Sequence, residues 1–250
     1  MIDWLLAHPV TQVFVYAMLT ALATGLGALP FAVIRTMSPR VMAMANAVAA
    51  GLMLGASFGL LLEGTRISGL ATFIGTNLGL VFILVTQRLL GDHDHETEFL
   101  GTRGAGARRM LLMLVIMTVH SFAEGAAVGV SFGGGAKLAT AITLAVAVHN
   151  IPEGLAISAV MWPQGASLLA CAAWSVFSSL PQPLAAVPAF LFVERVRAAL
   201  PYGLGFAAGA MVFMVLVELL PEAYERAWSR SVAGVTALTL VGMLLLQRYL

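Results

Sequence analysis

The sequence has few charged residues. Only 10% of its 250 residues are Asp, Glu, Lys or Arg, and 60% are hydrophobic, whereas a soluble domain carries roughly 25% charged residues. This composition excludes an ordinary soluble domain and predicts an integral membrane protein with a single domain over residues 1–250. The net charge of +1 gives no reason to expect a nucleic-acid partner.

Cysteine and several familiar motifs are also scarce. The single Cys171 excludes an internal disulfide framework and a Cys-rich zinc site, and we expect it to pack as a small hydrophobic residue. The chain has no Walker motif and no HExxH sequence, so neither ATP nor any other organic cofactor is expected. Its first ten residues lack a basic region and a cleavage site, so no signal peptide is expected.

Long apolar stretches are what the chain has instead. A membrane-spanning helix needs about 20 apolar residues, and eight stretches meet that length, which predicts an all-α polytopic membrane protein with eight transmembrane helices. A polar segment, 91–109, separates the third span from the fourth and is expected to be a His-containing cytoplasmic loop. The expected spans are Val10–Ile34, Val41–Leu62, Ser68–Leu90, Met110–Phe132, Leu138–Met161, Ala166–Phe192, Tyr202–Leu220 and Ser231–Leu250.

The distribution of basic residues predicts the orientation. Eight spans put both termini on one side of the membrane, and Lys and Arg are enriched in cytoplasmic loops. With the termini outside, the inner loops hold eight of the 13 basic residues, including the cluster Arg103, Arg108 and Arg109, and the outer side holds five. We therefore expect a multi-pass protein of the cell (inner) membrane with both termini outside.

A repeated motif occupies the middle of the fourth and fifth spans. "VHSFAEG" at 119–125 and "VHNIPEG" at 148–154 are offset by 29 residues. Consecutive spans run in opposite directions, so the repeat is inverted, as in many secondary transporters. "AAGLM" at 49–53 and "AAGAM" at 207–211 form a weaker second pair. Together these pairs predict a 3+2+3 inverted-repeat bundle with the fourth and fifth spans at its centre.

The repeated residues predict a metal site. His120 and Glu124 are four residues apart, as are His149 and Glu153, and positions i and i+4 share one helix face. Charged groups near a bilayer midplane cost a few kcal/mol, and two imidazoles with two carboxylates form a nitrogen and oxygen site for a divalent transition metal. Zn²⁺ fits well, with Fe²⁺, Mn²⁺ and Cd²⁺ as alternatives. A pair of interhelical hydrogen bonds with protonated Glu is the other interpretation, and Asn150 is a candidate ligand for a second, adjacent ion.

"HNIPEG" on one span with "HSFAEG" on the span before resembles the ZIP family of divalent-metal transporters, and this variant resembles the bacterial GufA-like branch. The resemblance covers nearly the whole chain. It implies a metal site on the fourth and fifth spans, which maps to His120, Glu124, His149 and Glu153, and a second-span contact for which Met53 is the candidate. Ser121 stands where the family pattern has Asn, and Gln182 stands where a Glu is common, so we expect one tightly held ion and not two.

Taken together, the sequence predicts a transporter that imports divalent metal, with Zn²⁺ as the transported ion. The expected partners are the metal ion, the lipid bilayer and a second copy in a homodimer. The main alternative is an intramembrane zinc hydrolase with three ligands, an open water position and a general base. A metal-sensing scaffold without transport is a third hypothesis.

Overall fold

The computed structural model describes residues 8–34, 36–90, 98–99, 102–103 and 105–249, and nearly all of them are helical. Seven helical segments in this part of the chain are long and apolar enough to cross a membrane. The fold is therefore an all-α polytopic membrane bundle, as expected. The main helices are α2 (Pro9–Leu26), α3 (Pro39–Leu90), α4 (Ala105–Gly133), α5 (Ala136–Met161), α6 (Leu168–Ser179), α7 (Pro181–Arg195), α8 (Leu200–Met214), α9 (Leu220–Arg226) and α10 (Ser229–Tyr249).

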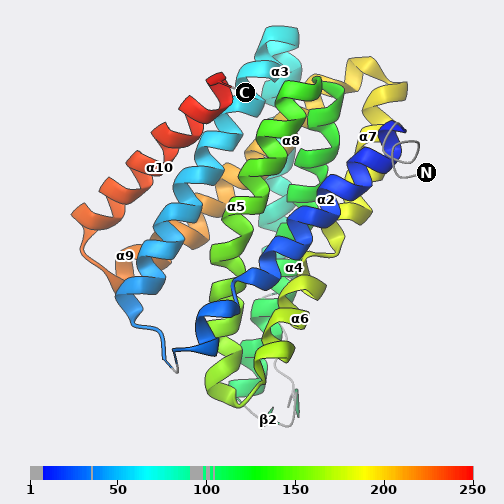
Figure 1. Cartoon of the computed structure of the whole chain (residues 1–250). Coiled ribbons are helices and arrows are strands. Elements are labelled where there is room, and N and C mark those ends of the chain that lie inside the picture. Colours follow the sequence, from blue (N-terminus) through cyan, green and yellow to red (C-terminus); the bar gives the residue numbers. More distant parts are fainter. Residues whose placement is uncertain (1–7, 35, 91–97, 100–101, 104, 250) are drawn as a thin grey trace.

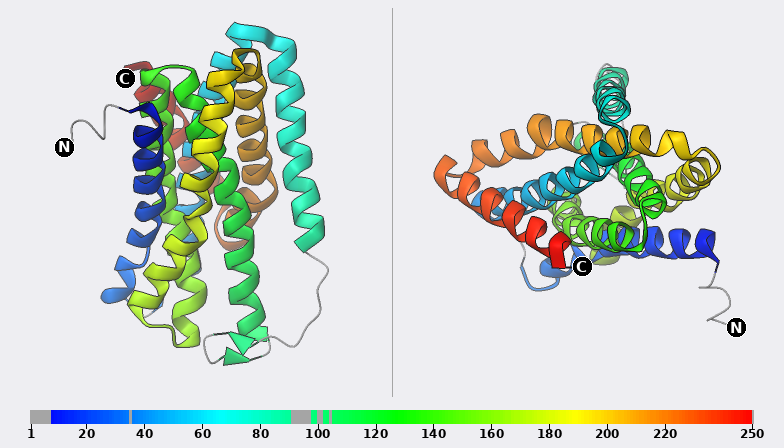
Figure 2. Two further views of the ribbon diagram at one scale, coloured as in Figure 1. Left: turned by 90° about the vertical axis from the view of Figure 1, so that its right-hand side faces the viewer. Right: turned by 90° about the horizontal axis from the view of Figure 1, so that it is seen from above.

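Seven such segments stand where eight were expected, because two of the expected spans are joined in one segment. The second and third expected spans form one helix of 52 residues, α3, whose backbone leaves helical geometry only at Ser68 (φ −160°, ψ 109°). The residues between these two expected spans remain helical up to Ser68, and the Thr65 hydroxyl donates to the backbone carbonyls of Leu61 and Leu62. The chain nevertheless turns back near Ser68, so the parts of α3 before and after this residue run antiparallel through the bundle (Figure 2).

Several other boundaries differ from the expected ones. The sixth span consists of two helices, α6 and α7, which meet at Leu180, because Pro181 begins a new helix. The seventh continues from α8 through a π-helical turn, η4 (Val215–Leu219), into α9. Helix α4 begins at Ala105 and not at Met110, since Ala and Arg favour helix. Short 3-10 turns follow α2, α5 and α7, namely η1 (Leu29–Ala32), η2 (Trp162–Gln164) and η3 (Arg197–Ala199).

The predicted loop before α4 is only partly described. Residues 98–99 and 102–103 form two short antiparallel strands, β1 (Glu98–Phe99) and β2 (Thr102–Arg103), with Glu98 opposite Arg103. The His-containing stretch at 92–97 lies outside the described residues, so the expected cytoplasmic loop stays a prediction there.

Helices α4 and α5 run in opposite directions through the middle of the bundle (Figure 1). Gly135 joins them in a left-handed conformation (φ 107°), which glycine adopts without steric cost. Helices α2, α6 and α7 pack around this pair, while α3, α8 and α10 pack chiefly on one another. Helix α2 begins and α10 ends at the same end of the bundle, which agrees with an even number of crossings (Figure 1).

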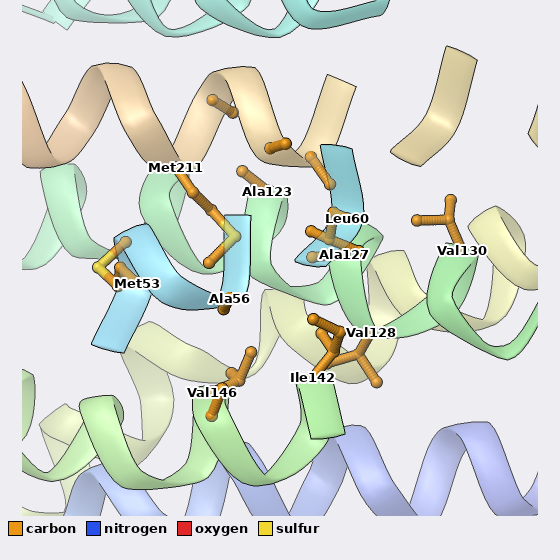
Figure 3. Packing of buried hydrophobic residues seen from close by; sticks show 14 of the residues in the cluster. Met53, Ala56, Leu60, Ala123, Ala127, Val128, Val130, Ile142, Val146 and Met211 are labelled. Carbon is orange, nitrogen blue, oxygen red and sulfur yellow. The ribbon is translucent and has the colours of Figure 1, made fainter. Parts of the chain in front are cut away.

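An apolar core fills the space between these groups. It is built mostly from Ala, Val, Leu and Met side chains of α3, α4, α5, α7 and α8. Met53 of α3 and Met211 of α8 lie in it together with Ala123 and Ala127 of α4 (Figure 3). The two "AAG" segments of the weaker repeat thus both contribute to this core, and the polar residues of the repeated motif lie beside it.

Candidate metal centre

The repeated motif brings four ionisable side chains to one place inside the bundle. His120 and Glu124 project from α4, and His149 and Glu153 project from α5. The side chains of all four are at most 3% exposed to solvent. Antiparallel packing of the two helices therefore places the two His/Glu pairs opposite each other, as the spacing of four residues predicts.

The distances show how closely these groups approach. His120 Nε2 lies 3.2 Å from Glu124 Oε1 and 3.1 Å from Glu153 Oε1. His149 Nε2 lies 2.5 Å from Glu124 Oε1 and 3.9 Å from Glu153 Oε1. One oxygen of each carboxylate thus faces both imidazole nitrogens, and single atoms of His120, Glu124 and Glu153 all lie within 4.8 Å of one another.

These separations suit a metal ion better than they suit a closed hydrogen-bond network. Neighbouring ligand atoms around a tetrahedral zinc ion lie about 3.3 Å apart when the bonds are about 2.0 Å. Both contacts of His120 are close to that value, yet neither has hydrogen-bond geometry, so His120 Nε2 and Glu153 Oε1 are buried without a hydrogen-bond partner. The His149–Glu124 contact is a hydrogen bond and must lengthen slightly to admit an ion.

Two amide side chains extend the centre on the side of α2 and α7. Gln182 Nε2 donates to Glu124 Oε2 over 2.7 Å, and Asn150 Nδ2 donates to Gln182 Oε1 over 3.1 Å. Asn150 Nδ2 also donates to the backbone carbonyl of Thr20 over 2.7 Å, and the Thr20 hydroxyl lies 2.6 Å from Gln182 Oε1. Side chains from α2, α4, α5 and α7 are therefore joined in one buried polar network.

Each glutamate is followed by a glycine that permits close packing. A Cβ on Gly125 would lie 2.3 Å from the backbone oxygen of Gln182, and one on Gly154 would lie 1.7 Å from the backbone oxygen of Thr24. Real Cβ atoms do not approach so closely, so a side chain at either position would push the helices apart. The Glu-Gly pairs therefore place both carboxylates where α4 meets α7 and where α5 meets α2.

Pro152 lies inside α5, between the two site residues of that helix. Proline has no N–H, so it cannot donate a helical hydrogen bond to the carbonyl of Val148. The equivalent position on α4 is Ala123, which is fully buried. The two halves of the repeat thus share their His and Glu residues but differ in their backbone hydrogen bonds.

The remaining predicted residues have different surroundings. Ser121 is buried, and its Oγ has no hydrogen-bond partner among the described residues. Met53 packs in the apolar core (Figure 3), and a role as a ligand stays a prediction. Glu222, which is not one of the predicted site residues, accepts a hydrogen bond from Asn46 and pairs with Arg226.

Thr20 was not predicted from the sequence. It is fully buried on α2, 130 residues before Asn150, which donates to its backbone carbonyl. The available signal is weak: Thr20 and Thr24 are four residues apart on an otherwise apolar span. The Thr24 hydroxyl is hydrogen bonded to that of Ser179 over 2.8 Å, so this face of α2 is polar along two turns.

Comparison with known proteins gives a consistent result. The family model described as "ZIP Zinc transporter" matches residues 86–246, which include all four ionisable residues of the centre. A protein of Arabidopsis thaliana named as a zinc transporter is 43% identical over 237 residues, which are 94% of this chain and 38% of the plant protein. This chain thus spans well under half the length of that relative.

Two bacterial relatives match over most of their length. The zinc transporter GufA of Myxococcus xanthus is 31% identical over 231 residues, covering 86% of this chain and 90% of that protein. The zinc transporter ZIPB of Bordetella bronchiseptica is 33% identical over 217 residues, covering 81% of this chain and 70% of that protein. None of these matches supports the alternative of an intramembrane hydrolase.

Proposed function

The chain belongs to the ZIP zinc transporter family, and we propose that it carries divalent transition-metal ions across a membrane, with Zn²⁺ as its preferred cargo. The observation that carries this proposal is the convergence of two imidazoles and two carboxylates, all buried, from antiparallel helices. A divalent ion at this position offsets the charge of both carboxylates, which are otherwise costly inside a membrane.

The four site residues act as the cargo's ligands in this proposal. Two imidazole nitrogens and two carboxylate oxygens complete a tetrahedral set for zinc, and the same atoms accept Fe²⁺, Mn²⁺ or Cd²⁺ with lower preference. Asn150 and Gln182 adjoin this set with neutral amide groups, and Ser121 is neutral as well, which supports a single ion at the centre. Met53 is the remaining candidate contact, from the side of α3.

Transport and not hydrolysis is proposed because the site is duplicated. A hydrolase needs one metal, an open water position and a general base, and a second set of ligands on an antiparallel helix adds nothing to that chemistry. An inverted pair of ligand sets suits a carrier that exposes the same ion to either side in turn. The family relationship favours the same choice, since the relatives described above are named as zinc transporters.

The proposal extends to orientation and assembly. We propose import across the inner cell membrane, and an orientation with both termini outside, which the excess of Lys and Arg in the loops assigned to the inside supports. A homodimer is the proposed assembly, which measurement of mass in detergent tests directly. The energy source is proton antiport or facilitated passage, because the ligands must lose protons to bind metal.

Uptake of ⁶⁵Zn into proteoliposomes tests the proposal. With inner metal and pH fixed, the purified protein is expected to raise zinc uptake above that of empty liposomes. The matched control is the Glu124→Ala/Glu153→Ala variant, which keeps the helices but lacks both carboxylates. Equal uptake by the parent protein and by empty liposomes, together with hydrolysis of a lipid or peptide, would reverse the choice between carrier and enzyme.

A further inference from the structure

Gln182 has an unusual number of specific partners for a neutral residue inside a membrane bundle. Its side chain is fully buried. Its amide nitrogen donates to Glu124 Oε2, and its amide oxygen lies within hydrogen-bond distance of both the Thr20 hydroxyl and the Asn150 amide nitrogen. Three helices are thus tied to α7 through one side chain.

The orientation of this amide is determined by its neighbours. An ionised Glu124 carboxylate can accept hydrogen bonds but cannot donate one, and Asn150 Nδ2 can donate but cannot accept. The opposite orientation would set the Gln182 oxygen against the Glu124 carboxylate and its nitrogen against Asn150 Nδ2. The single Thr20 proton is shared between Gln182 Oε1 and the backbone carbonyl of Ala17, at 2.6 Å and 2.7 Å, so Thr20 contributes less than Asn150.

The consequence is a difference between the two carboxylates of the centre. Glu124 Oε2 is held by Gln182, and Glu124 Oε1 faces the two histidines. Glu153 has no hydrogen-bonding partner for its Oε1 among the described residues, and no comparable amide holds it. Glu124 is therefore fixed in rotation and offers one oxygen to an ion, whereas Glu153 can offer one or two.

We propose that Gln182 is a specificity-determining residue that restricts Glu124 to a single metal-binding oxygen. Two imidazole nitrogens, one oxygen of Glu124 and one of Glu153 give the four-coordinate set that zinc prefers. Mn²⁺ favours six ligands rich in oxygen, and a carboxylate that cannot turn to offer its second oxygen disfavours it. Gln182 thus selects zinc without touching it, an inference that rests on the proposed metal transport.

The variant Gln182→Ala tests this selection. Removing the amide frees Glu124 to rotate and bind through both oxygens. In competition assays with proteoliposomes, the ratio of Mn²⁺ to Zn²⁺ uptake is expected to rise by roughly fivefold, the change that corresponds to about 1 kcal/mol, the typical worth of one hydrogen bond. X-ray absorption of the zinc-loaded protein is expected to show one or two additional oxygen ligands with both imidazoles retained.

Ser179→Ala is the matched control. It removes another buried hydrogen bond between α6 and α2, the one to Thr24, without touching Glu124, and is expected to leave both the uptake ratio and the zinc coordination unchanged. If Gln182→Ala does not fold, Thr20→Val decides the question, because it removes one partner of the Gln182 oxygen and is expected to shift the uptake ratio in the same direction by a smaller factor.

The outcomes separate this inference from the proposed function. An unchanged uptake ratio and an unchanged zinc coordination in Gln182→Ala, or in Thr20→Val where that variant decides, would overturn the role of Gln182 while leaving transport intact. An equal shift in Ser179→Ala would also overturn it, since the effect would then come from general loosening of the bundle. Absence of imidazole ligands around zinc in the parent protein would instead overturn the proposed site itself.

Discussion

The two halves of the repeat, on α4 and α5, have the same His and Glu residues but differ in the contacts that hold those side chains. In both, a histidine precedes a glutamate by four residues, and the glutamate precedes a glycine that packs on a neighbouring backbone. On α4 the glutamate is held by Gln182, and the helix has Ala123 where α5 has Pro152. On α5, Glu153 Oε1 has no hydrogen-bond partner in the part of the chain that the structure describes. The comparison teaches that two segments with the same His and Glu residues can hold their side chains with different firmness.

This difference suggests a division of roles during transport. In the proposed transport, a rigid Glu124 carboxylate on α4 would define where the ion sits, and an adaptable Glu153 carboxylate on α5 would give way to water as the ion arrives or leaves. Pro152 also makes α5 the more adaptable of the two helices, because a helix that lacks one backbone hydrogen bond bends more easily. Four predictions test this comparison, beginning with the change of largest expected effect.

The largest effect is expected when both halves lose their carboxylates. Glu124→Ala/Glu153→Ala removes both negative charges and leaves two imidazoles. Zinc affinity is expected to fall by more than ~100-fold, since altering even the residues that support metal ligands costs up to about that much. Equilibrium dialysis with ⁶⁵Zn measures the affinity, and gel filtration in detergent controls for folding. Near-normal affinity in a folded variant would mean that the ion binds elsewhere.

The second prediction concerns pH and treats the two halves as equivalent. Metal binds only to neutral imidazole and ionised carboxylate, so bound protons are released when zinc enters. Zinc affinity is expected to weaken as pH falls from about 7.5 to about 5.5, by up to about tenfold per pH unit for each proton displaced, since an unperturbed imidazole titrates near pH 6.5. Calorimetry in two buffers of different ionisation enthalpy counts the protons.

Single histidine variants sharpen this test. His120→Ala and His149→Ala are each expected to lower the number of protons released, and by a similar amount, because each imidazole belongs to one half. Tight zinc binding with no proton release over that pH range would contradict the assignment of these four ligands. It would instead favour the network of interhelical hydrogen bonds with protonated Glu.

The sequence predicted that these four side chains converge, because the relevant information is local. The spacing of four residues fixes a shared helix face, and the length of each apolar stretch fixes its depth, so the convergence of His120, Glu124, His149 and Glu153 followed from α4 and α5 alone. The union of two spans in α3 was not predicted, because Gly64 and Thr65 resemble a junction, while the actual turn depends on the backbone at Ser68.

The hydrogen bonds that surround the centre were harder to predict, because they join residues that are far apart in the sequence. Gln182 was expected to matter only as a neutral replacement, and its hydrogen bond to Glu124 joins residues 58 positions apart. Thr20 was not singled out, since a threonine in an apolar span commonly bonds to its own helix, as Thr118 and Thr76 do here. Contacts of this kind depend on how α2 and α7 pack, which no periodicity in the sequence reveals.

The third prediction compares conservative changes at the two carboxylates. Aspartate is shorter by one methylene, so Glu124→Asp cannot keep both the contact to Gln182 and those to the histidines. Its zinc affinity is expected to fall at least about tenfold, because a hydrogen bond to a charged group is worth about 1.5–3 kcal/mol. Glu153→Asp is expected to lose several times less, since that side chain is free to adjust. The same dialysis assay measures both, and equal losses would argue against a rigid and an adaptable half.

The smallest effect is expected from making the two motifs alike at the proline. Pro152→Ala gives α5 the residue that α4 has at the matching position and restores an N–H that can donate to the Val148 carbonyl. Thermal stability is expected to rise, by up to about 3 kcal/mol if the full helix propensity is recovered, and zinc affinity is expected to stay within about threefold, because all four ligands remain and the change corresponds to less than 1 kcal/mol. Uptake is expected to slow modestly, since a stiffer α5 holds Glu153 more firmly. A loss of uptake as large as that of the double glutamate variant would show that the Val148 carbonyl, and not only the side chains, belongs to the path of the ion.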